Sequence, residues 1–495
     1  WLKQLWLKRV STHPEGSLAP HKMAMFTICL AWLLAQPALA KPRPVRSFTV
    51  YSDPIHLHRG EVHNAYVEPK ALPEDFVQRF ANKTVHIRSM QLDMVRLDAV
   101  TGTETALPLY ETYNHHHALL LGPARDLEKV YNYTKGIDPL NPQGRPRPHS
   151  HGCAMKGSTI RELLQKAARG KGRGHIASFG GASGAEFRGT PTRLPEPYTY
   201  AVSSPESFMI LMHFINTRDV PHEQKLWECP CTKARKINVT NGTIDGMRPL
   251  PFDCSEELLR EHNTACSLDT YQGGYRCCEH GVFLLDERPD PAVPADMIQA
   301  KFTFEYYDET GPAAAGLRPT TQPQCCDATA GSGTTKRRKF ANIEYDVPQC
   351  APGTRPEHCQ HVISSVEFFD FSNSSHHGGP MPDPDEELEL VHAWGHQHVG
   401  ALGLELVRES TGEVLCRSRP VYGSGSRPGD EAGFLVGIPP CVWGPPPLAP
   451  PPRLRRGELV RTVARYNSSQ QHHGVMSLWL MQAAPVQEPR AAVFV

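Results

Sequence analysis

The sequence predicts an all-β protein built from two tandem antiparallel β-sandwiches of the jelly-roll kind. Proline (46 residues) and glycine (39 residues) are abundant, which disfavours long helices and favours short strands joined by turns. Short strand-like runs recur on both sides of a stretch rich in Gly, Ala, Thr and Pro at 312–340. A chain of 495 residues is too long for one ordinary core, so two domains are expected.

The first sandwich is expected within residues 41–311. Its strands are indicated by the runs RSFTVYS, KTVHIRSMQLDMVRLDAV, HALLLG, TYAVS and SFMILMHFIN. The last run is apolar on both faces, as suits a strand inside a sandwich. A cysteine-rich insertion at about 221–296 interrupts the pattern and holds one short predicted helix, SEELLREH, capped by Ser255. The run MIQAKFTFEYYDE then resumes the alternation and returns to the first sandwich.

Residues 312–340 are interpreted as a linker and residues 341–495 as the second sandwich. The strands of this second block are indicated by HVISSVEFFDF, LELVHAWGHQHVGALGLELVRES, EVLCRSRPVYG, ELVRTVARYN and GVMSLWLMQAA. A compact basic run at 336–339 falls in the linker, where it is either an exposed segment or, in a secreted protein, a processing site.

The N-terminal residues indicate a secreted protein. Residues 1–40 read as an N-terminal extension and signal peptide, since an apolar run from Met25 to Leu34 is followed by small residues that suit cleavage before Lys41. No later segment approaches 18 consecutive apolar residues, so no transmembrane anchor is expected. Lys+Arg and Asp+Glu both number 52, so neither nucleic acid nor an anionic membrane is an expected partner.

Glycosylation and disulfides are expected in that compartment. Six N-glycosylation sequons occur, at Asn82, Asn132, Asn238, Asn241, Asn373 and Asn467. The chain has 14 cysteines, or 13 once Cys29 leaves with the signal peptide, and an oxidising compartment turns most of them into disulfides. The C-P-C and C-C spacings in the insertion do not match zinc knuckles, which favours disulfides over zinc there.

Candidate metal ligands occur in the second half. His396 and His398 are two apart on a predicted strand, so both side chains point to one face and can offer one ion two imidazoles. The alternative is a chance pair on a solvated face. Met476 opens the last strong strand, and its thioether favours Cu(I) over zinc or calcium, although core packing is the alternative.

Histidines of the first half form a second candidate group. His115, His116 and His117 begin a predicted strand, and His213 lies in an apolar strand. A buried imidazole is costly unless its nitrogens find partners, which a metal ion or an ordinary hydrogen bond in the core can supply. Adjacent histidines on a regular strand face opposite ways, so two of the triplet can share an ion only at a strand end or a bulge.

These motifs, in this order, resemble the copper type II, ascorbate-dependent monooxygenases, the family of peptidylglycine α-hydroxylating monooxygenase and dopamine β-monooxygenase. GTPTRLPEPYTYAVSSPESFMILMHFINTRD is similar to the segment around the third ligand of the family's first copper. HQHVG and GVMSLWLM are similar to its HxH and methionine segments. YNHHHALLLG, SFGGASGAEFRGT and GHQHVGALGLELV resemble more closely still the stress-up-regulated nodulin family of plants. The cysteine-rich insertion lies outside the monooxygenase pattern.

The resemblance implies two copper ions. The implied ligands are two of His115, His116 and His117 with His213 at the first site, and His396, His398 and Met476 at the second. Within the triplet, His115 and His116 are preferred because His117 then falls where the monooxygenases carry an apolar residue. An alignment on the following leucines selects His116 and His117 instead. No catalytic residue is assigned beyond the metal ligands.

The resemblance also implies a chemistry. In the monooxygenases the first copper stores an electron, the second binds O2 beside the substrate C–H bond, and ascorbate reduces both. Peptide-hydroxylating relatives carry an arginine two residues before HxH, where this chain has Trp394, and their asparagine and tyrosine after the methionine are Leu478 and Leu480. A small apolar or aromatic substrate is therefore expected, rather than a peptide carboxyl terminus. The alternative function is a non-catalytic secreted stress or binding protein that keeps the fold.

Overall fold

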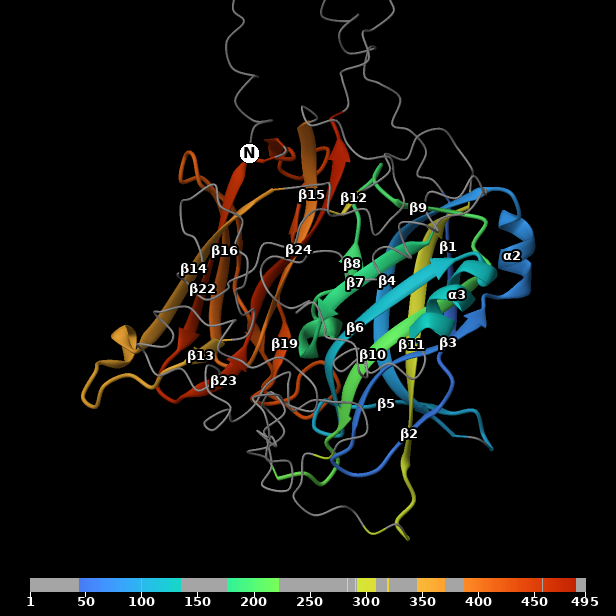
Figure 1. Cartoon of the computed structure of the whole chain (residues 1–495), viewed down its shortest axis with the longest axis horizontal. Helices are drawn as coiled ribbons and strands as arrows, with labels where there is room; N and C mark the ends of the chain where they lie inside the picture. The colour runs from blue at the N-terminus through green and yellow to red at the C-terminus, as the bar shows by residue number, and fades with distance from the viewer. Residues whose placement is uncertain are drawn as a thin grey trace, which may run out of the picture. The chain divides into compact units, whose positions relative to one another are not determined.

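The computed structural model confirms an all-β fold of antiparallel sheets, shown in Figure 1. It describes residues 44–98, 100–134, 176–221, 283, 290, 292–308, 318–319, 345–369, 387–455 and 457–486. Residues 1–44 and 45–495 are separate units, and the second is compact. The predicted signal segment, most of the cysteine-rich insertion with its expected helix, and most of the predicted linker lie outside the described residues. The domain boundaries at 311 and 340 therefore stay predictions.

Two sheets form the first sandwich. One contains, in spatial order, β1 (Val45–Tyr51), β11 (Asp296–Tyr307), β4 (Thr84–Leu97) and β5 (Glu104–Ala106), with β2 (Ile55–Leu57) on β11 and with β8 (Thr192–Arg193) and β9 (Tyr200–Ser203) on β4. The other contains β3 (Val62–Ala71), β10 (Ser207–Asn216), β6 (Thr112–Gly122) and β7 (Ala177–Ser183). Both sheets contribute to one core, as Phe302 and Phe304 of β11 and Ile210 and Phe214 of β10 show. The segment after the insertion, β11, returns to the first sheet, as predicted.

Two helices cover this sandwich. They are α2 (Glu74–Phe80) and α3 (Ala124–Thr134). Acidic residues occupy the first turn of each helix, where they complement the positive end of the helix dipole. In α2, Phe76 and Phe80 are four residues apart, so both side chains lie on the face that packs into the core.

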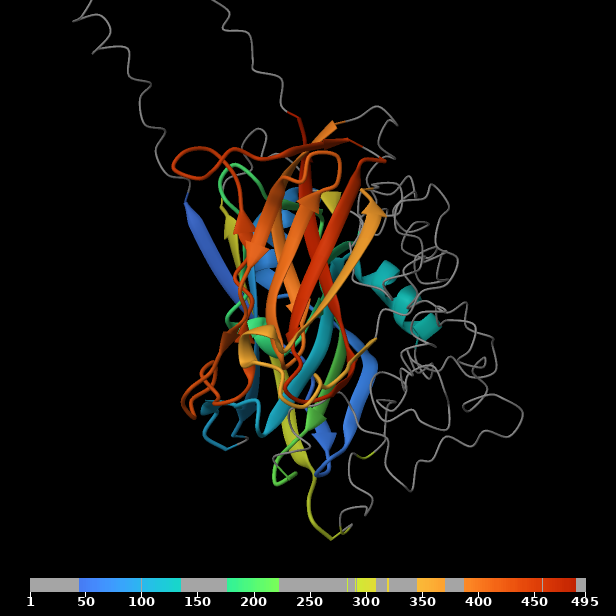
Figure 2. The same cartoon turned by 90° about the vertical axis from the view of Figure 1, so that its left-hand side faces the viewer.

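The second sandwich also has two sheets, whose orange and red strands lie toward the viewer in Figure 2. The first contains β12 (Arg318–Pro319), β24 (Ser477–Pro485), β15 (Glu387–Gln397) and β20 (Cys441–Val442), with β21 (Arg453–Arg455) on β15. The other contains β14 (Gln360–Phe368), β22 (Leu459–Asn467), β16 (Ala401–Arg408) and β17 (Val414–Ser418). Two small pairs, β13 (Tyr345–Val347) with β23 (His472–Val475) and β18 (Val421–Tyr422) with β19 (Leu435–Gly437), complete this half with the short 3-10 helix η7 (Pro356–His358). Trp479, Leu404 and Tyr466 meet in its core.

A break in the pairing of β15 with β24 determines which side chains of β15 face away from this core. The register shifts between Leu390 and His392. Leu388 and Leu390 before the shift and Ala393 after it belong to the core of the second sandwich. Because side chains alternate along a strand, Trp394 and the histidines in phase with it point to the opposite face.

A short segment at 184–190 joins the two halves of the chain. It contains the 3-10 helix η1 (Ala185–Arg188). Arg188 pairs with Asp93 of the first half at 2.6 Å and with the buried Glu431 of the second half at 3.4 Å. The amide of Gly189 donates to the carbonyl of Val436 at 3.1 Å, and a Cβ at position 189 would lie 2.3 Å from that oxygen. Only glycine therefore allows this approach.

The described residues hold two disulfides, Cys350–Cys359 and Cys416–Cys441. They confirm the expectation of disulfide bonds. Cys416 lies on β17 and Cys441 on β20, so this bond ties together the two sheets of the second sandwich. Among the described helices, none is long and apolar enough to cross a membrane.

Removing the Cys416–Cys441 bond should destabilise the second sandwich. The bond closes a loop with a sequence separation of 25. Constraint of the unfolded chain by such a loop contributes about 3 kcal/mol. We expect the double variant Cys416→Ser/Cys441→Ser to lose about that much free energy of unfolding in urea titrations. Removal of Cys350–Cys359, with a separation of 9, should cost less, and an equal or larger loss there would contradict the loop argument.

His392 on β15 should make the fold sensitive to acid. The side chain is buried, and neither ring nitrogen has a hydrogen-bond partner within the described part of the chain. Burial lowers the pKa of His392 from 6.5 to about 4. Because the folded pKa is the lower one, the unfolded chain binds more protons below pH 6.5. The contribution of His392 to stability is present above that pH and is lost as the pH falls toward 4, a loss of roughly 3 kcal/mol.

The variant His392→Phe keeps a ring of similar shape and removes the titrating group. We expect its free energy of unfolding to fall less than that of the wild type between about pH 7 and pH 4.5, as measured by urea titration at each pH. The same acid-induced loss in both proteins would show that His392 does not carry this sensitivity.

Candidate metal centre

The histidine triplet lies on β6, where a β-bulge changes the direction of its side chains. In the pairing with β10, His116 lies opposite His213 and Asn114 lies opposite Phe214, so His115 is the extra residue. Nδ1 of His115 then lies 3.1 Å from Nδ1 of His116. The ring of His213 lies 4.2 Å from that of His115 and 4.6 Å from that of His116, measured between centroids.

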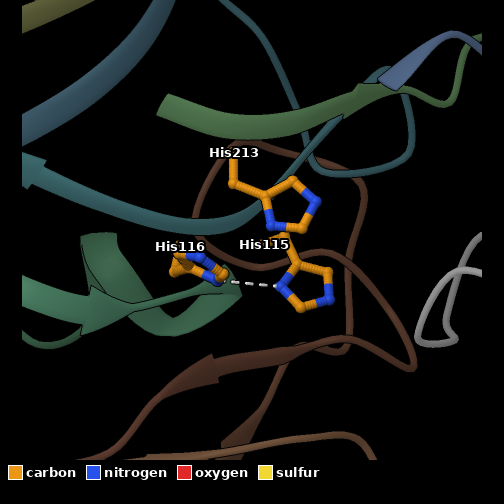
Figure 3. Close-up of side chains that lie close together, drawn as sticks. All are labelled: His115, His116 and His213. Atoms are coloured by element: carbon orange, nitrogen blue, oxygen red, sulfur yellow. Dashed lines mark hydrogen bonds between the residues drawn. The ribbon is translucent and has the colours of Figure 1, made fainter. Parts of the chain in front are cut away.

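These three side chains are arranged so that one ion could contact all of them. One ligand atom from each of His115, His116 and His213 lies within 4.8 Å of the others. Figure 3 shows the rings of these residues turned toward one another. The bulge that two neighbouring histidines need in order to share an ion is therefore present in β6.

His117 points away from this group. Its ring lies 6.1 Å from that of Phe302 in the core of the first sandwich, and its Nδ1 lies 3.3 Å from the side-chain Nδ2 of Asn114. Of the two pairs that sequence left open, the structure brings His115 and His116 together with His213. It places His117 in the sandwich core.

Burial keeps His115 and His213 of this first group neutral. Burial, with His396 nearby, lowers the pKa of His115 to about 3. Burial, with His115 and His116 nearby, lowers the pKa of His213 well below its usual value. Neutral imidazole is the form that binds metals. Both ring nitrogens of His213 lack a hydrogen-bond partner among the described residues, a costly arrangement for a fully buried side chain.

The second group lies at the end of β15. Nε2 of His396 and Nε2 of His398 are 3.0 Å apart, and the two residues are only 3 % and 5 % exposed. They occupy the same face, as their spacing predicts. Burial, with His115 nearby, lowers the pKa of His398 well below its usual value. This pair can therefore offer two imidazole nitrogen atoms to one ion, and burial keeps that of His398 neutral.

Met476 is held alongside this pair by Tyr466. The Tyr466 hydroxyl accepts a hydrogen bond from the amide of His398 at 3.1 Å and donates one to the carbonyl of Met476 at 2.6 Å. Ser477 pairs with Gln397, so Met476 is one residue beyond the paired strands, next to His398. The Met476 side chain is buried.

The two histidine groups lie next to each other. The ring of His398 lies 5.7 Å from that of His115 between centroids, with the two ring planes almost perpendicular. The sequence predicts one group in each half of the chain. It does not predict that the two groups are neighbours, because their separation depends on how the two halves pack.

Glu186 is a polar residue of this centre that sequence reasoning did not select. Its side chain is 0 % exposed, and its Oε1 lies 2.9 Å from Nδ1 of His396 and accepts a hydrogen bond from the amide of Gly184 at 2.9 Å. A single acidic residue in SFGGASGAEFRGT has no spacing that marks it as functional. Its proximity to His396, 210 residues away, follows only from the tertiary structure.

An apolar cluster adjoins the His396–His398 pair. Trp394, Leu478 and Leu480 pack together on the same face of β15 and β24. Leu480 pairs with Trp394, and Leu478 pairs with His396. Trp394, Leu478 and Leu480 therefore form one buried patch beside the second histidine group.

Comparisons with known proteins place the chain in a family. No curated protein matches it. Among solved structures, a similarity is found to that titled "Structure of the Macrobrachium rosenbergii Nodavirus", with a TM-score of 0.14 and 6% identity over 97% of this chain and 99% of that chain, which is too low to inform on the fold. The family model described as "Stress up-regulated Nod 19" matches residues 43–485. Since that match spans most of the sequence, the protein belongs to the stress up-regulated Nod 19 family.

Proposed function

We propose that this protein is a secreted copper protein with two neighbouring sites, which hydroxylates a small apolar or aromatic molecule with O2 and ascorbate. The observation that carries the proposal is the convergence of five histidines from three distant segments of the chain. They are His115, His116, His213, His396 and His398. Four of these side chains are buried, and this concentration of imidazole is difficult to explain by packing alone.

The donor set fits copper. His115, His116 and His213 would hold one ion, and an ion there would satisfy a nitrogen of His213 that otherwise lacks a partner among the described residues. His396 and His398, with Met476 beside them, would hold the other. Neutral imidazoles with a thioether favour Cu(I), and copper supplies one-electron chemistry with O2 when a reductant is present.

The surroundings of the second pair favour an apolar substrate. Trp394 and the two leucines of the neighbouring patch carry no charge, so none of them can form an ion pair with a carboxylate. Their burial excludes water from the side of the site where the substrate C–H bond would lie. We therefore infer that recognition rests on apolar contact, and that peptide carboxyl termini are not substrates.

Secretion is part of the proposal. Three of the six sequons, at Asn82, Asn132 and Asn467, lie among the described residues, and all three asparagines are exposed, as glycosylation requires. Both described disulfides are compatible with an oxidising compartment.

A second candidate function is a non-catalytic secreted protein that binds the metal without turnover. The burial of the centre favours it, because His115, His213, His396 and His398 leave little surface for a substrate to reach. Ascorbate-dependent O2 consumption by the copper-loaded protein separates the two functions, since a non-catalytic protein would consume none above its background.

Copper stoichiometry tests the first site. We expect purified wild-type protein to bind two copper ions per chain, and His213→Ala to bind about one, because that change removes the most buried ligand of the first group. His392→Ala is the matched control, since His392 is equally buried but outside both groups, and it should keep two ions. The measurement is metal analysis after removal of unbound copper. A wild-type content below one ion per chain would refute the copper proposal.

The thioether of Met476 is tested by Met476→Ile, which keeps the bulk and removes the sulfur. We expect the fold to survive and the Cu(I) affinity to fall by about tenfold or more, because the soft ligand is lost. Competition with a chromogenic Cu(I) chelator measures this change. Met481→Ile is the control, because Met481 lies on β24, the strand that follows Met476, but packs in the core of the second sandwich, and it should leave the affinity unchanged.

A further inference from the structure

We propose that Glu186 is a positioning residue for His396, which it holds with Nδ1 toward the carboxylate and Nε2 toward His398. This inference rests on the proposed copper function and adds to it a residue outside the ligand set. It also assigns to the first half of the chain a part in shaping the ligand pair of the second half.

The contact between Glu186 and His396 selects one form of the ring. Oε1 of Glu186 lies 2.9 Å from Nδ1 of His396, so the N–H at Nδ1 donates to the carboxylate. A neutral imidazole with its proton on Nδ1 has its lone pair on Nε2. That Nε2 is the atom 3.0 Å from Nε2 of His398, so the lone pair faces the place where a shared ion would bind. A carboxylate that accepts from the second nitrogen of a metal-binding histidine commonly fixes its orientation and raises its basicity.

Glu186 is itself held in place by the strand that carries the first histidine group. The backbone amide of Gly184 donates to Oε1 of Glu186, and the side-chain Nδ2 of Asn114 on β6 donates to the carbonyl of Gly184 at 2.8 Å. A Cβ at position 184 would lie 2.6 Å from the carbonyl oxygen of His115 and 2.8 Å from Cε1 of His396. Glycine at 184 thus lets this loop fit between the two histidine groups.

The environment of the second carboxylate oxygen of Glu186 indicates that a nearby positive charge would stabilise this site. Oε2 has no hydrogen-bond partner among the described residues, although the side chain is fully buried. The neighbouring Arg188 does not neutralise it, because Arg188 pairs with Asp93 and Glu431. A buried carboxylate with a free oxygen is costly, and a cation bound by the adjacent histidine pair would reduce that cost.

The test uses two changes at position 186 in full-length protein that also carries His213→Ala, so that only the second site is loaded. Glu186→Gln keeps the shape and an acceptor oxygen but removes the charge, and Glu186→Ala removes both. We expect copper affinity at the second site to fall about tenfold for Gln and toward a hundredfold for Ala, the range found when such outer partners are lost. The Cu(II) electron paramagnetic resonance spectrum should also change its hyperfine splitting, because the His396 ring is no longer held.

Glu431→Gln in the same background is the matched control. Glu431 is as buried as Glu186 and also lies where the halves meet, but it contacts Arg188 and the backbone amides of Leu109 and Gly429. It should lower the melting temperature and leave the copper affinity and the spectrum unchanged. Equal weakening of copper binding by Glu431→Gln and Glu186→Gln would mean that Glu186 acts only through stability, and would overturn the proposal.

Other outcomes are equally decisive. Native affinity and an unchanged spectrum in both Glu186 variants would overturn the positioning role while leaving the copper function intact. If Glu186→Ala does not fold, Glu186→Gln alone decides, since its size is that of the native residue. A wild-type protein that binds no copper would refute the proposed function together with this inference.

Discussion

The β-bulge at His115 is the local feature on which the arrangement of the candidate centre depends. On a regular strand, neighbouring side chains point to opposite faces, and His115 and His116 could not approach one ion together. The extra residue opposite β10 brings both rings to His213. The same irregularity leaves His117 in phase with the core, where it packs near Phe302. One inserted residue thus separates the histidines of a row into two environments.

The contact between the two halves of the chain then completes the centre. The segment at 184–190 passes between them, and its close approaches require glycine at 184 and at 189. Arg188 and Glu431 add an ion pair at the same place, while Glu186 reaches His396. Residues from both halves therefore define the geometry of the second histidine pair. A metal bound there would also stabilise the packing of the halves, because it would bind only the assembled form.

Electrostatics explains why such a group of histidines can be buried. Charged imidazolium rings at these separations would repel one another and would pay the cost of leaving water. The depressed pKa values of His115, His213 and His398 keep these rings neutral, which is also the state that metal binding requires. Glu186 is a carboxylate in contact with the group, through His396. His115, His213 and His398 can thus approach a cation without carrying positive charge of their own.

The sequence by itself determined the all-β class, several of the strands, and the common face of His396 and His398. It also determined the resemblance to the nodulin family, which the family match over residues 43–485 confirms. These features depend on local periodicity and on motifs, and both are visible along one chain. The secretory signal and the cysteine-rich insertion lie outside the described residues and remain predictions. The tertiary structure alone decided which two of the triplet approach His213, that the two histidine groups are neighbours, and that Glu186 contacts His396. A bulge depends on the pairing of two strands, and a contact across 210 residues depends on the packing of the two halves, so neither has a local signature.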